Sequence, residues 1–464
     1  MPHPRMSSRW TMVLPVACAA IVAAGWSAGT ALPAQAATPV TITLNGTSAT
    51  ASSTTGVAIS GSVVTLTAAG SYQFAGSLSN GRIVVNSTGT VEIILNGVTI
   101  ANTTGSALQV TAASAVSITL SAGTSNSLTD ATSYTSTETE AALYSTANLT
   151  IGGTGALTVK GNAYDGIAST AGLTINSGTI TVNAADDAIR GKNFLVVNGG
   201  TVSATAVADG LKATNDTDTT LGYVTIAGGS VTVSAGDDGI HGESALNIST
   251  GTVTVTRSVE GLEATKINLT GGTITVTASD DGINGSDGVS NANANSAAVV
   301  VTISGGTIVV NAGGDGVDSN GTLRMTGGTM VVNGPTANNN GALDANGTFT
   351  VTGGKLLAAG SSGMVVTPGT GSIGWVSATF GASQPAGTLI HLANSSGTVL
   401  FSFRSSKQLQ NVVFSLNTIT NGQSYRVYTG GSVSGTSTGG MYTGGSISGA
   451  TLALTVTAGV RTGR

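Results

Sequence analysis

Seven acidic residues recur in the middle of the sequence at intervals that indicate stacked, equivalent segments. The intervals are 22, 22, 29, 22, 21 and 34 residues, and three of the seven directly follow another aspartate. The seven are Asp165, Asp187, Asp209, Asp238, Glu260, Asp281 and Asp315. If equivalent segments lie on one another, these carboxylates form a column along one edge of the protein. Such a column offers the oxygen ligands that Ca²⁺ prefers.

This column needs compensating charge, because carboxylates about 4.8 Å apart repel by roughly 3.5 kcal/mol at an effective dielectric constant of about 20. Three residues after the acid, the earlier repeats carry bases and the later repeats do not. These positions are, in order, Arg190, Lys212, His241, Glu263, Asn284 and Asp318. We therefore predict bound calcium. Its predicted ligands are Asp186, Asp187, Asp209, Asp237, Asp238, Asp280, Asp281 and Asp315.

A purely structural role for the same acids stays open. Aspartate before glycine is common in tight turns, where its side chain bonds to nearby backbone amides. In that interpretation, the acids shape one turn of each repeat and hold no metal.

The elements that would position these acids form a repeat of about 22 residues. Blocks of the type Gly-Thr-Ile-Thr-Val begin at Gly178, Gly200, Gly229, Gly251, Gly272, Gly306, Gly328 and Gly354. An alternating apolar pair such as Leu173 and Ile175 precedes the block, and an Asp-Gly-Ile segment supplies a third aliphatic residue. Alternation with period two predicts strands with one buried face, and glycine suits tight corners. We therefore predict an all-β fold, a parallel β-helix with three strands per coil.

Composition supports a long β protein and excludes several other classes. Glycine is frequent, at 68 of 464 residues, while charged residues make up 8% and proline only 8 residues. These values do not fit a helical enzyme, a collagen or a polar disordered chain. Residues 165–344 hold 17 acids and 6 bases, so we do not expect nucleic-acid binding.

The N-terminal segment reads as a targeting signal. Arg5 and Arg9 precede an apolar stretch, and Ala34-Gln-Ala offers a cleavage site near Ala36–Ala37. Residues 1–36 are therefore predicted to be a signal peptide, with lipid attachment at Cys18 as an alternative. The mature chain would have no cysteine, and we expect a secreted, extracellular protein without membrane insertion.

Three further segments follow the signal peptide. We predict irregular coils over residues 37–160, the regular parallel β-helix over 161–374, and a β-rich C-terminal cap over 375–464. The cap would cover strand edges that are otherwise open at the end of the array.

Several motifs resemble a known family of secreted bacterial carbohydrate-binding proteins. They are Asn80-Gly-Arg-Ile-Val, Leu95-Asn-Gly-Val-Thr-Ile, Asp165-Gly-Ile, Asp186-Asp-Ala-Ile-Arg-Gly-Lys, Ala208-Asp-Gly-Leu-Lys-Ala and Tyr425-Arg-Val-Tyr-Thr-Gly. The resemblance implies a right-handed parallel β-helix similar to that of polysaccharide lyases. It also implies binding of cellulose-like and acidic, pectin-like polysaccharides, with bound calcium. The family's doubled acid is absent at Glu260 and at Asp315.

From these residues we predict a monomeric, calcium-dependent polysaccharide-binding protein without catalytic residues. Its predicted sugar-binding residues are Asp165, Arg190, Lys192, Lys212 and Tyr164. One alternative is a pectate-type lyase, in which an arginine or lysine near the column takes a proton that calcium has acidified. Another is a structural stalk or adhesin, although a spacer does not need acids gathered on one edge.

Overall fold

The computed structural model describes residues 38–134, 140–288 and 294–461 of the 464-residue chain. The predicted signal peptide and Cys18 lie outside the described residues. Every strand of the described residues lies in one compact unit, Pro39–Arg464. The described residues contain strands but no helix, so no helix there is long and apolar enough to cross a membrane. The all-β prediction is confirmed.

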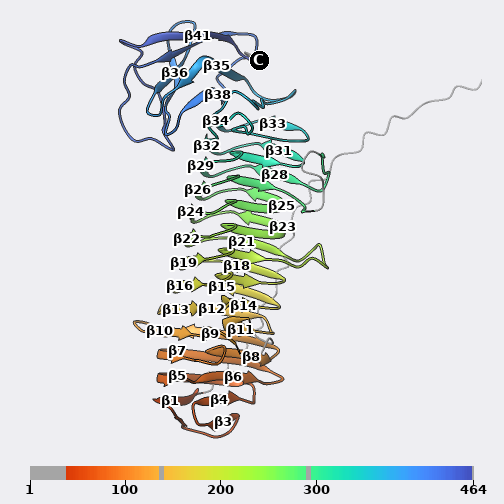
Figure 1. Ribbon diagram of the computed structural model, residues 1–464, viewed down its shortest axis with the longest axis vertical. Coiled ribbons are helices and arrows are strands. Elements are labelled where there is room, and N and C mark those ends of the chain that lie inside the picture. Colours follow the sequence, from red (N-terminus) through yellow and green to blue (C-terminus); the bar gives the residue numbers. More distant parts are fainter. Residues whose placement is uncertain (1–37, 135–139, 289–293, 462–464) are drawn as a thin grey trace, which may run out of the picture. The chain divides into compact units, whose positions relative to one another are not determined.

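Most strands belong to one large sheet in which equivalent strands stack in parallel (Figure 1). Each strand pairs with its equivalent in the preceding and following repeats. Three consecutive strands, one from each of three stacks, make one coil. The first stack comprises β4 (Val63–Leu66), β6 (Arg82–Asn86), β8 (Leu108–Ala112), β11 (Ala141–Ser145), β14 (Asp165–Ser169), β17 (Ile189–Gly191), β20 (Leu211–Ala213), the start of β23 (Ile240–Ile248), the start of β25 (Leu262–Leu269), β27 (Ile283–Gly285) and β30 (Val317–Ser319).

The second stack continues along the same coils and uses the later parts of β23 and β25. Its other members are β1 (Val40–Gly46), β5 (Gly70–Ser79), β7 (Thr90–Ala101), β9 (Ala115–Leu120), β12 (Leu149–Gly153), β15 (Gly172–Ile175), β18 (Phe194–Val197), β21 (Tyr223–Ile226), β28 (Val300–Ile303), β31 (Thr322–Met325) and β33 (Phe349–Val351).

The third stack begins with the ends of β1, β5 and β7, and it closes each coil. It comprises β10 (Ser125–Thr129), β13 (Ala156–Gly161), β16 (Thr179–Ala184), β19 (Thr201–Ala206), β22 (Ser230–Ser234), β24 (Thr252–Arg257), β26 (Thr273–Ala278), β29 (Thr307–Ala312), β32 (Thr329–Asn333) and β34 (Lys355–Gly360). Two short strands, β2 (Ala49–Ala51) and β3 (Val57–Ser60), pair antiparallel with β1 and β4. The hand in which the coils wind stays a prediction.

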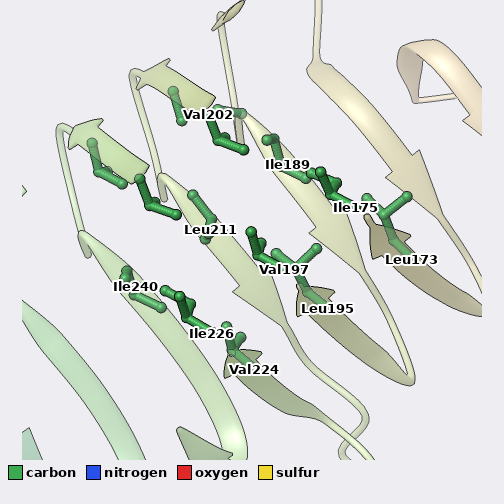
Figure 2. Packing of buried hydrophobic residues seen from close by; sticks show 14 of the residues in the cluster. Leu173, Ile175, Ile189, Leu195, Val197, Val202, Leu211, Val224, Ile226 and Ile240 are labelled. Atoms are coloured by element: carbon green, nitrogen blue, oxygen red, sulfur yellow. The ribbon is translucent and has the colours of Figure 1, made fainter. Parts of the chain in front are cut away.

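The interior is a set of aliphatic rows that cross successive coils. In the second stack, Leu173, Leu195 and Val224 are register neighbours, and each is fully buried. Figure 2 shows this row beside the parallel row of Ile175, Val197 and Ile226. Burying one such side chain stabilises the fold by about 1.5–3 kcal/mol. Because each row repeats in every coil, one continuous core cluster extends from Ile42 to Val413.

The glycines that begin the Gly-Thr-Ile-Thr-Val blocks form the corner between the second and third stacks. Gly178 has a φ of 103° and Gly200 a φ of 85°, in the region that favours glycine. A Cβ atom at Gly200 would also lie 2.6 Å from the carbonyl oxygen of Gly178 in the neighbouring coil. Both backbone conformation and stacking therefore require glycine at this corner, as the sequence predicts.

The C-terminal strands leave the parallel pattern. β35 (Trp375–Gln384) and β38 (Leu409–Ser415) pair antiparallel, and β38 also pairs antiparallel with β34, the last strand of the third stack. The other strands form a separate antiparallel sheet in the order β40-β37-β36-β39-β41. Their bounds are β36 (Leu389–Asn394), β37 (Val399–Arg404), β39 (Ser424–Thr429), β40 (Met441–Tyr442) and β41 (Thr451–Thr457).

One outward-facing row of the third stack changes from threonine to aliphatic residues where the C-terminal strands pack. Thr232, Thr254 and Thr275 occupy this row in the middle coils, and Val309, Val331 and Leu357 follow in register. Val331 and Leu357 are fully buried in a second core cluster shared with the C-terminal strands. The exchange of threonine for aliphatic residues therefore creates the surface on which the C-terminal strands pack.

Candidate functional site

The recurring acids form one column, and five of the seven accept a hydrogen bond from the backbone of the next coil. The Oδ1 atom of Asp165 accepts a hydrogen bond from the backbone N–H of Asp187 at 3.2 Å, and Asp187 accepts one from Asp209 at 3.0 Å. Asp209 accepts one from Asp238 at 2.9 Å. All four carboxyl groups are buried. One oxygen of Asp165, of Asp187 and of Asp209 thus fixes the backbone of the following coil, which is the structural role that the sequence left open.

Glycine follows every column acid except Asp187, which precedes Ala188, and packing against the interior explains this glycine. A Cβ atom at Gly166 would lie 2.1 Å from Cγ1 of Val182, and one at Gly210 would lie equally close to Cγ1 of Val233. Real side chains do not approach so closely in a packed core. The Asp-Gly pair therefore combines a backbone-bonding acid with a residue that leaves room for the third stack.

A second column runs beside the acids, three residues further along each coil. Strand register makes Arg190, Lys212 and His241 direct neighbours. The same row continues through Glu263, Asn284 and Asp318. The backbone N–H of Asp344 bonds to the carbonyl of Val317 at 2.7 Å, which adds Asp344 beside Asp318. The second column therefore changes from basic to acidic along the stack.

At the basic end, the cations neutralise the acid column directly. Arg190 Nε lies 2.7 Å from Asp165 Oδ2 and 3.8 Å from Asp187 Oδ2, while its Nη2 lies 3.0 Å from exposed Glu140. Lys212 Nζ lies 2.7 Å from Asp209 Oδ2 and 3.2 Å from Asp187 Oδ2. Burial raises the pKa of Asp165 to about 7, although Arg190 opposes that shift.

In the middle of the stack, His241 joins both columns. Its Nδ1 lies 2.8 Å from Asp238 Oδ2 and 3.4 Å from Glu263 Oε2. Burial alone would lower the pKa of His241, but hydrogen bonds to these two carboxyl groups and their charges raise it to about 10. Burial raises the pKa of Glu263 to about 8, so Asp238 carries the negative charge opposite the imidazolium. A protonated imidazole cannot act as a metal ligand.

At the acidic end, three carboxyl groups meet without a base. Ligand atoms of Asp315, Asp318 and Asp344 all lie within 4.8 Å of one another. Burial, followed by the charges of Asp315 and Asp344, raises the pKa of Asp318 to about 7, and burial raises that of Asp315 to about 6. Within the described ranges, these three acids form no ion pair. This arrangement favours either proton uptake or a bound cation.

Asp281 connects this acidic group to the rest of the acid column. Its Oδ1 accepts the backbone N–H of Asp315 at 2.6 Å, and Asp315 in turn accepts that of Gly341 at 2.5 Å. Burial, with the charges of Asp315, Asp318 and Asp280 adding to it, raises the pKa of Asp281 to about 8. The hydrogen bond from the backbone of Asp315 offsets this rise in the pKa of Asp281 only in part.

The remaining predicted residues are less closely assembled. The first acid of each doubled pair is exposed, at Asp186, Asp237 and Asp280. Asp186 still lies within 4.8 Å of Asp165 and Asp187, judged by the nearest carboxylate oxygens. Lys192 is half-buried and forms no ion pair with the residues that the structure describes.

Tyr164 takes part in an aromatic contact near the basic end. Its ring packs edge-on against Tyr134, with centroids 5.2 Å apart. Tyr134 donates a hydrogen bond at 2.8 Å to buried Asp130. Tyr164 itself is 37% exposed, so its ring is accessible only in part.

A protein-family model described as carbohydrate-binding domain-containing protein matches residues 60–290 and 246–370. These ranges contain both columns and more than half of the chain. The chain belongs to this carbohydrate-binding family. No curated protein matches it. Among solved structures, the chain is similar to the polysaccharide lyase-like protein from C. thermocellum, determined as a gadolinium derivative, with 26% sequence identity. The match covers 62% of this chain and 97% of that one, with a TM-score of 0.45.

Membership of the carbohydrate-binding family confirms the general class that the sequence motifs indicate, and it leaves calcium untested. Sequence reasoning did not select Asp344 or assign a role to Asp318. Asp344 follows an irregular segment, so the spacing rule does not reach it. A signal does exist, because Ala342-Leu343-Asp344 repeats the small-aliphatic-acid pattern of Gly316-Val317-Asp318.

Proposed function

We propose that this carbohydrate-binding family member is a secreted, calcium-dependent polysaccharide-binding protein that does not cleave its ligand. The observation that carries the calcium assignment is the group of Asp315, Asp318 and Asp344, which lacks a compensating base in the described ranges. Hard oxygen ligands of this kind match the preference of Ca²⁺, which takes six to eight of them.

The other acid groups fit a calcium ion less well. Arg190 and Lys212 already neutralise Asp165, Asp187 and Asp209 through contacts of 2.7–3.8 Å. Among the predicted ligands, we therefore place calcium first at Asp315, supported by Asp318 and Asp344 rather than by the doubled acids. Calcium at Asp186, Asp187, Asp209, Asp237, Asp238, Asp280 and Asp281 stays a prediction.

If each of the three carboxylates gives one oxygen, Ca²⁺, which takes six to eight, keeps other positions open to water or to a ligand. A sugar carboxylate can fill such a position. Acidic, pectin-like chains would otherwise be repelled by the acid column, and calcium would convert that repulsion into attraction. Cellulosic chains carry no charge and need no such bridge.

We propose that the coils wind as a right-handed parallel β-helix that displays this edge outside the cell.

Lyase chemistry is the less favoured function. A lyase base must be able to lose its proton, but hydrogen bonds and charges from Asp165 and Asp187 raise the pKa of Arg190 despite its burial. Similar contacts raise the pKa of Lys212. Both cations are better suited to holding the acid column together. Ultraviolet absorbance of unsaturated product during incubation with polygalacturonate and calcium tests this directly, and no growth is expected.

Calcium dependence is tested by melting curves and by binding to polygalacturonate, each with calcium and with EDTA. A ligand present at 100 times its Kd stabilises the folded state by about 2.7 kcal/mol, so calcium should raise the melting temperature. Asp318→Asn and Asp344→Asn should reduce that gain, whereas Glu92→Gln, a matched change on β7, should not. An identical melting temperature with calcium and EDTA in the wild type would contradict the proposal.

A further inference from the structure

The C-terminal strands carry a charge opposite to that of the acid column. Residues 345–464 contain six bases and no acid, whereas residues 165–344 contain 17 acids and 6 bases. The family match ends at residue 370, before the separate antiparallel sheet of β36, β37, β39, β40 and β41 begins. Family membership therefore assigns no role to this sheet.

This sheet turns one face to the core and leaves the other face outside it. On β39, Tyr425 and Val427 belong to the second core cluster, so Arg426 and Tyr428 point to the opposite face. Arg426 is exposed and forms no ion pair with the residues that the structure describes. The outer face therefore carries a cation that is available to an acidic partner.

Strand β41 is an open edge of the same sheet (Figure 1). Within the described ranges it pairs only with β39, where Thr455 is the register neighbour of Arg426. Its seven residues carry no charge, although natural edge strands are commonly protected by charges or proline. Leu452, near its start, is 50% exposed, and Val460, just beyond its end, is 52% exposed. This edge thus combines apolar side chains with an arginine, a residue type that is enriched in protein interfaces.

A row of exposed acids beside the acid column has the complementary charge. Asp186, Asp237 and Asp280 lie in alternate coils, with Ala208 and Val259 in the coils between them. Backbone hydrogen bonds of 2.8–3.3 Å join these five residues in chain order, and we call them the outer acid row. Successive acids are therefore about 9.6 Å apart, which is twice the strand spacing. Within the described ranges, none of the three acids forms an ion pair.

The two surfaces also match in length and in apolar content. At about 3.4 Å per strand residue and 4.8 Å per coil, β41 and the outer acid row are each about 20 Å long. Val207, directly before Ala208 of this row, is 69% exposed. Val207, Val460 and Leu452 are the most exposed large apolar side chains of the described part of the chain. All three lie on one of these two surfaces, so a contact between the surfaces would remove all three from water.

The two surfaces do not meet within one chain. The C-terminal strands pack on Val331 of β32, two coils beyond β26, the strand that precedes Asp280. In the described residues, no hydrogen bond or ion pair joins β41 or Arg426 to the outer acid row. A contact between these surfaces therefore requires two molecules.

We propose that β41 and Arg426 of one copy dock on the outer acid row of a second copy of this chain. Because the two surfaces differ, each added copy leaves one surface of each kind free, and the contact repeats from molecule to molecule. The monomer that the sequence predicts is then the form at low concentration or high salt. This association requires neither calcium nor a glycan.

Sedimentation of the full chain in EDTA tests the proposal, because EDTA keeps the carboxylates free of calcium. At about 0.1 M salt, the average mass should rise with protein concentration beyond that of a dimer. At about 1 M salt it should stay near the mass of a monomer, because the Debye length falls from about 10 to about 3 Å.

Charge reversal locates the basic surface. Arg426→Glu places a like charge opposite the outer acid row, so the dissociation constant of self-association should rise about tenfold or more. Lys355→Glu is the matched control, because it makes the same charge change on an exposed residue of β34 and should keep wild-type association. Leu452→Ser should weaken association, whereas Met364→Ser, at another exposed apolar residue, should not. Melting curves check that all variants fold.

A mixture of two variants identifies the partner surface. Asp237→Asn/Asp280→Asn removes two charges from the outer acid row and keeps β41 and Arg426, whereas Arg426→Glu keeps the row. Each variant alone should associate weakly. Equal amounts of the two should form a complex with one copy of each and no larger species, because only one productive contact remains.

Three results would overturn the proposal. A wild-type mass that stays at the monomer value at every concentration in about 0.1 M salt would show that the copies do not dock. Equal association of Arg426→Glu and the wild type would exclude the C-terminal sheet. If Asp237→Asn/Asp280→Asn alone associates like the wild type, the copies meet through surfaces other than the outer acid row, such as β41 against β41.

Discussion

The ammonium group of Lys212 lies 2.7 Å from the carboxylate of Asp209, three residues earlier in its own coil. It also lies 3.2 Å from Asp187 in the preceding coil, and both acids are almost fully buried. One cation thus serves two acids that would otherwise repel each other. This arrangement shows how the column can tolerate closely stacked carboxyl groups.

Removal of this cation should destabilise the protein strongly. Breaking a buried ion pair costs about 3–5 kcal/mol, and Lys212→Met should fall near the lower end because the lysine side chain is 26% exposed. Chemical denaturation at neutral pH measures the loss. Lys160→Met removes an exposed lysine from β13 and should change the free energy of unfolding little. Equal losses in the two variants would show that the buried pairing is unimportant.

His241 should make stability depend on pH in the neutral to alkaline range. Its pKa is about 10 in the folded protein and about 6.5 in an unfolded chain, because Asp238 and Glu263 stabilise the charged ring. The folded state therefore holds the proton more tightly. The resulting stability is fully present below about pH 6.5 and is lost as pH rises toward 10.

The comparison of the wild type with His241→Gln isolates this contribution. The wild type should exceed the variant in unfolding free energy by the largest amount near pH 6. This difference should shrink steadily toward pH 10, because the pKa of His241 in the folded protein is about 10. Denaturant titrations at several pH values provide the measurement. A difference that is constant over the whole range would mean that the His241 charge does not contribute.

Removal of one charge from the group of Asp315, Asp318 and Asp344 should raise the melting temperature without calcium and reduce the stabilisation that calcium gives. Asp318→Asn relieves repulsion with Asp315 and Asp344, so it should raise the melting temperature in EDTA. It also removes a proposed ligand, so the gain on adding calcium should become smaller. A variant that lowers the melting temperature in EDTA would indicate that Asp318 has a stabilising partner instead.

Where glycine follows a column acid, as it does at every member except Asp187, it should not tolerate even a methyl group. Gly166→Ala would place Cβ 2.1 Å from Val182 Cγ1, and overpacking of this kind typically costs about 1–3 kcal/mol. Gly105→Ala is the matched control, because its Cβ would meet no atom within 4 Å. Thermal or denaturant unfolding compares the two. Similar stability in both variants would contradict the packing account.

Much of this architecture could be predicted because the sequence repeats its own geometry. The 22-residue spacing of Gly178 and Gly200 fixes a corner, and the same spacing of Asp165 and Asp187 aligns the acids. The spacing could not reveal that Lys212 contacts acids in two coils, because that depends on side-chain reach across the stack. The spacing does not select Asp344 for a different reason, because this residue follows a coil of irregular length.

The long insertions and the C-terminal strands show the same limit. The long intervals of 29 and 34 residues reveal two insertions, but strand positions are needed to place both at one corner. The antiparallel strands after Trp375 follow no repeat, so their pairing depends on contacts between distant segments. Periodicity therefore predicts the repeated interior well, and it says little about single features attached to it.

The backbone bonds of the acid column all point the same way along the chain. Asp165 Oδ1 accepts the N–H of Asp187, and Asp187 Oδ1 accepts that of Asp209. Where such a bond forms, a finished coil therefore presents a fixed acceptor to the coil that follows it, in the order in which the chain is synthesised. Repeat arrays can propagate structure from neighbour to neighbour. These aspartates thus make their own coil a template for the next one and give the growth of that part of the fold an N-to-C direction.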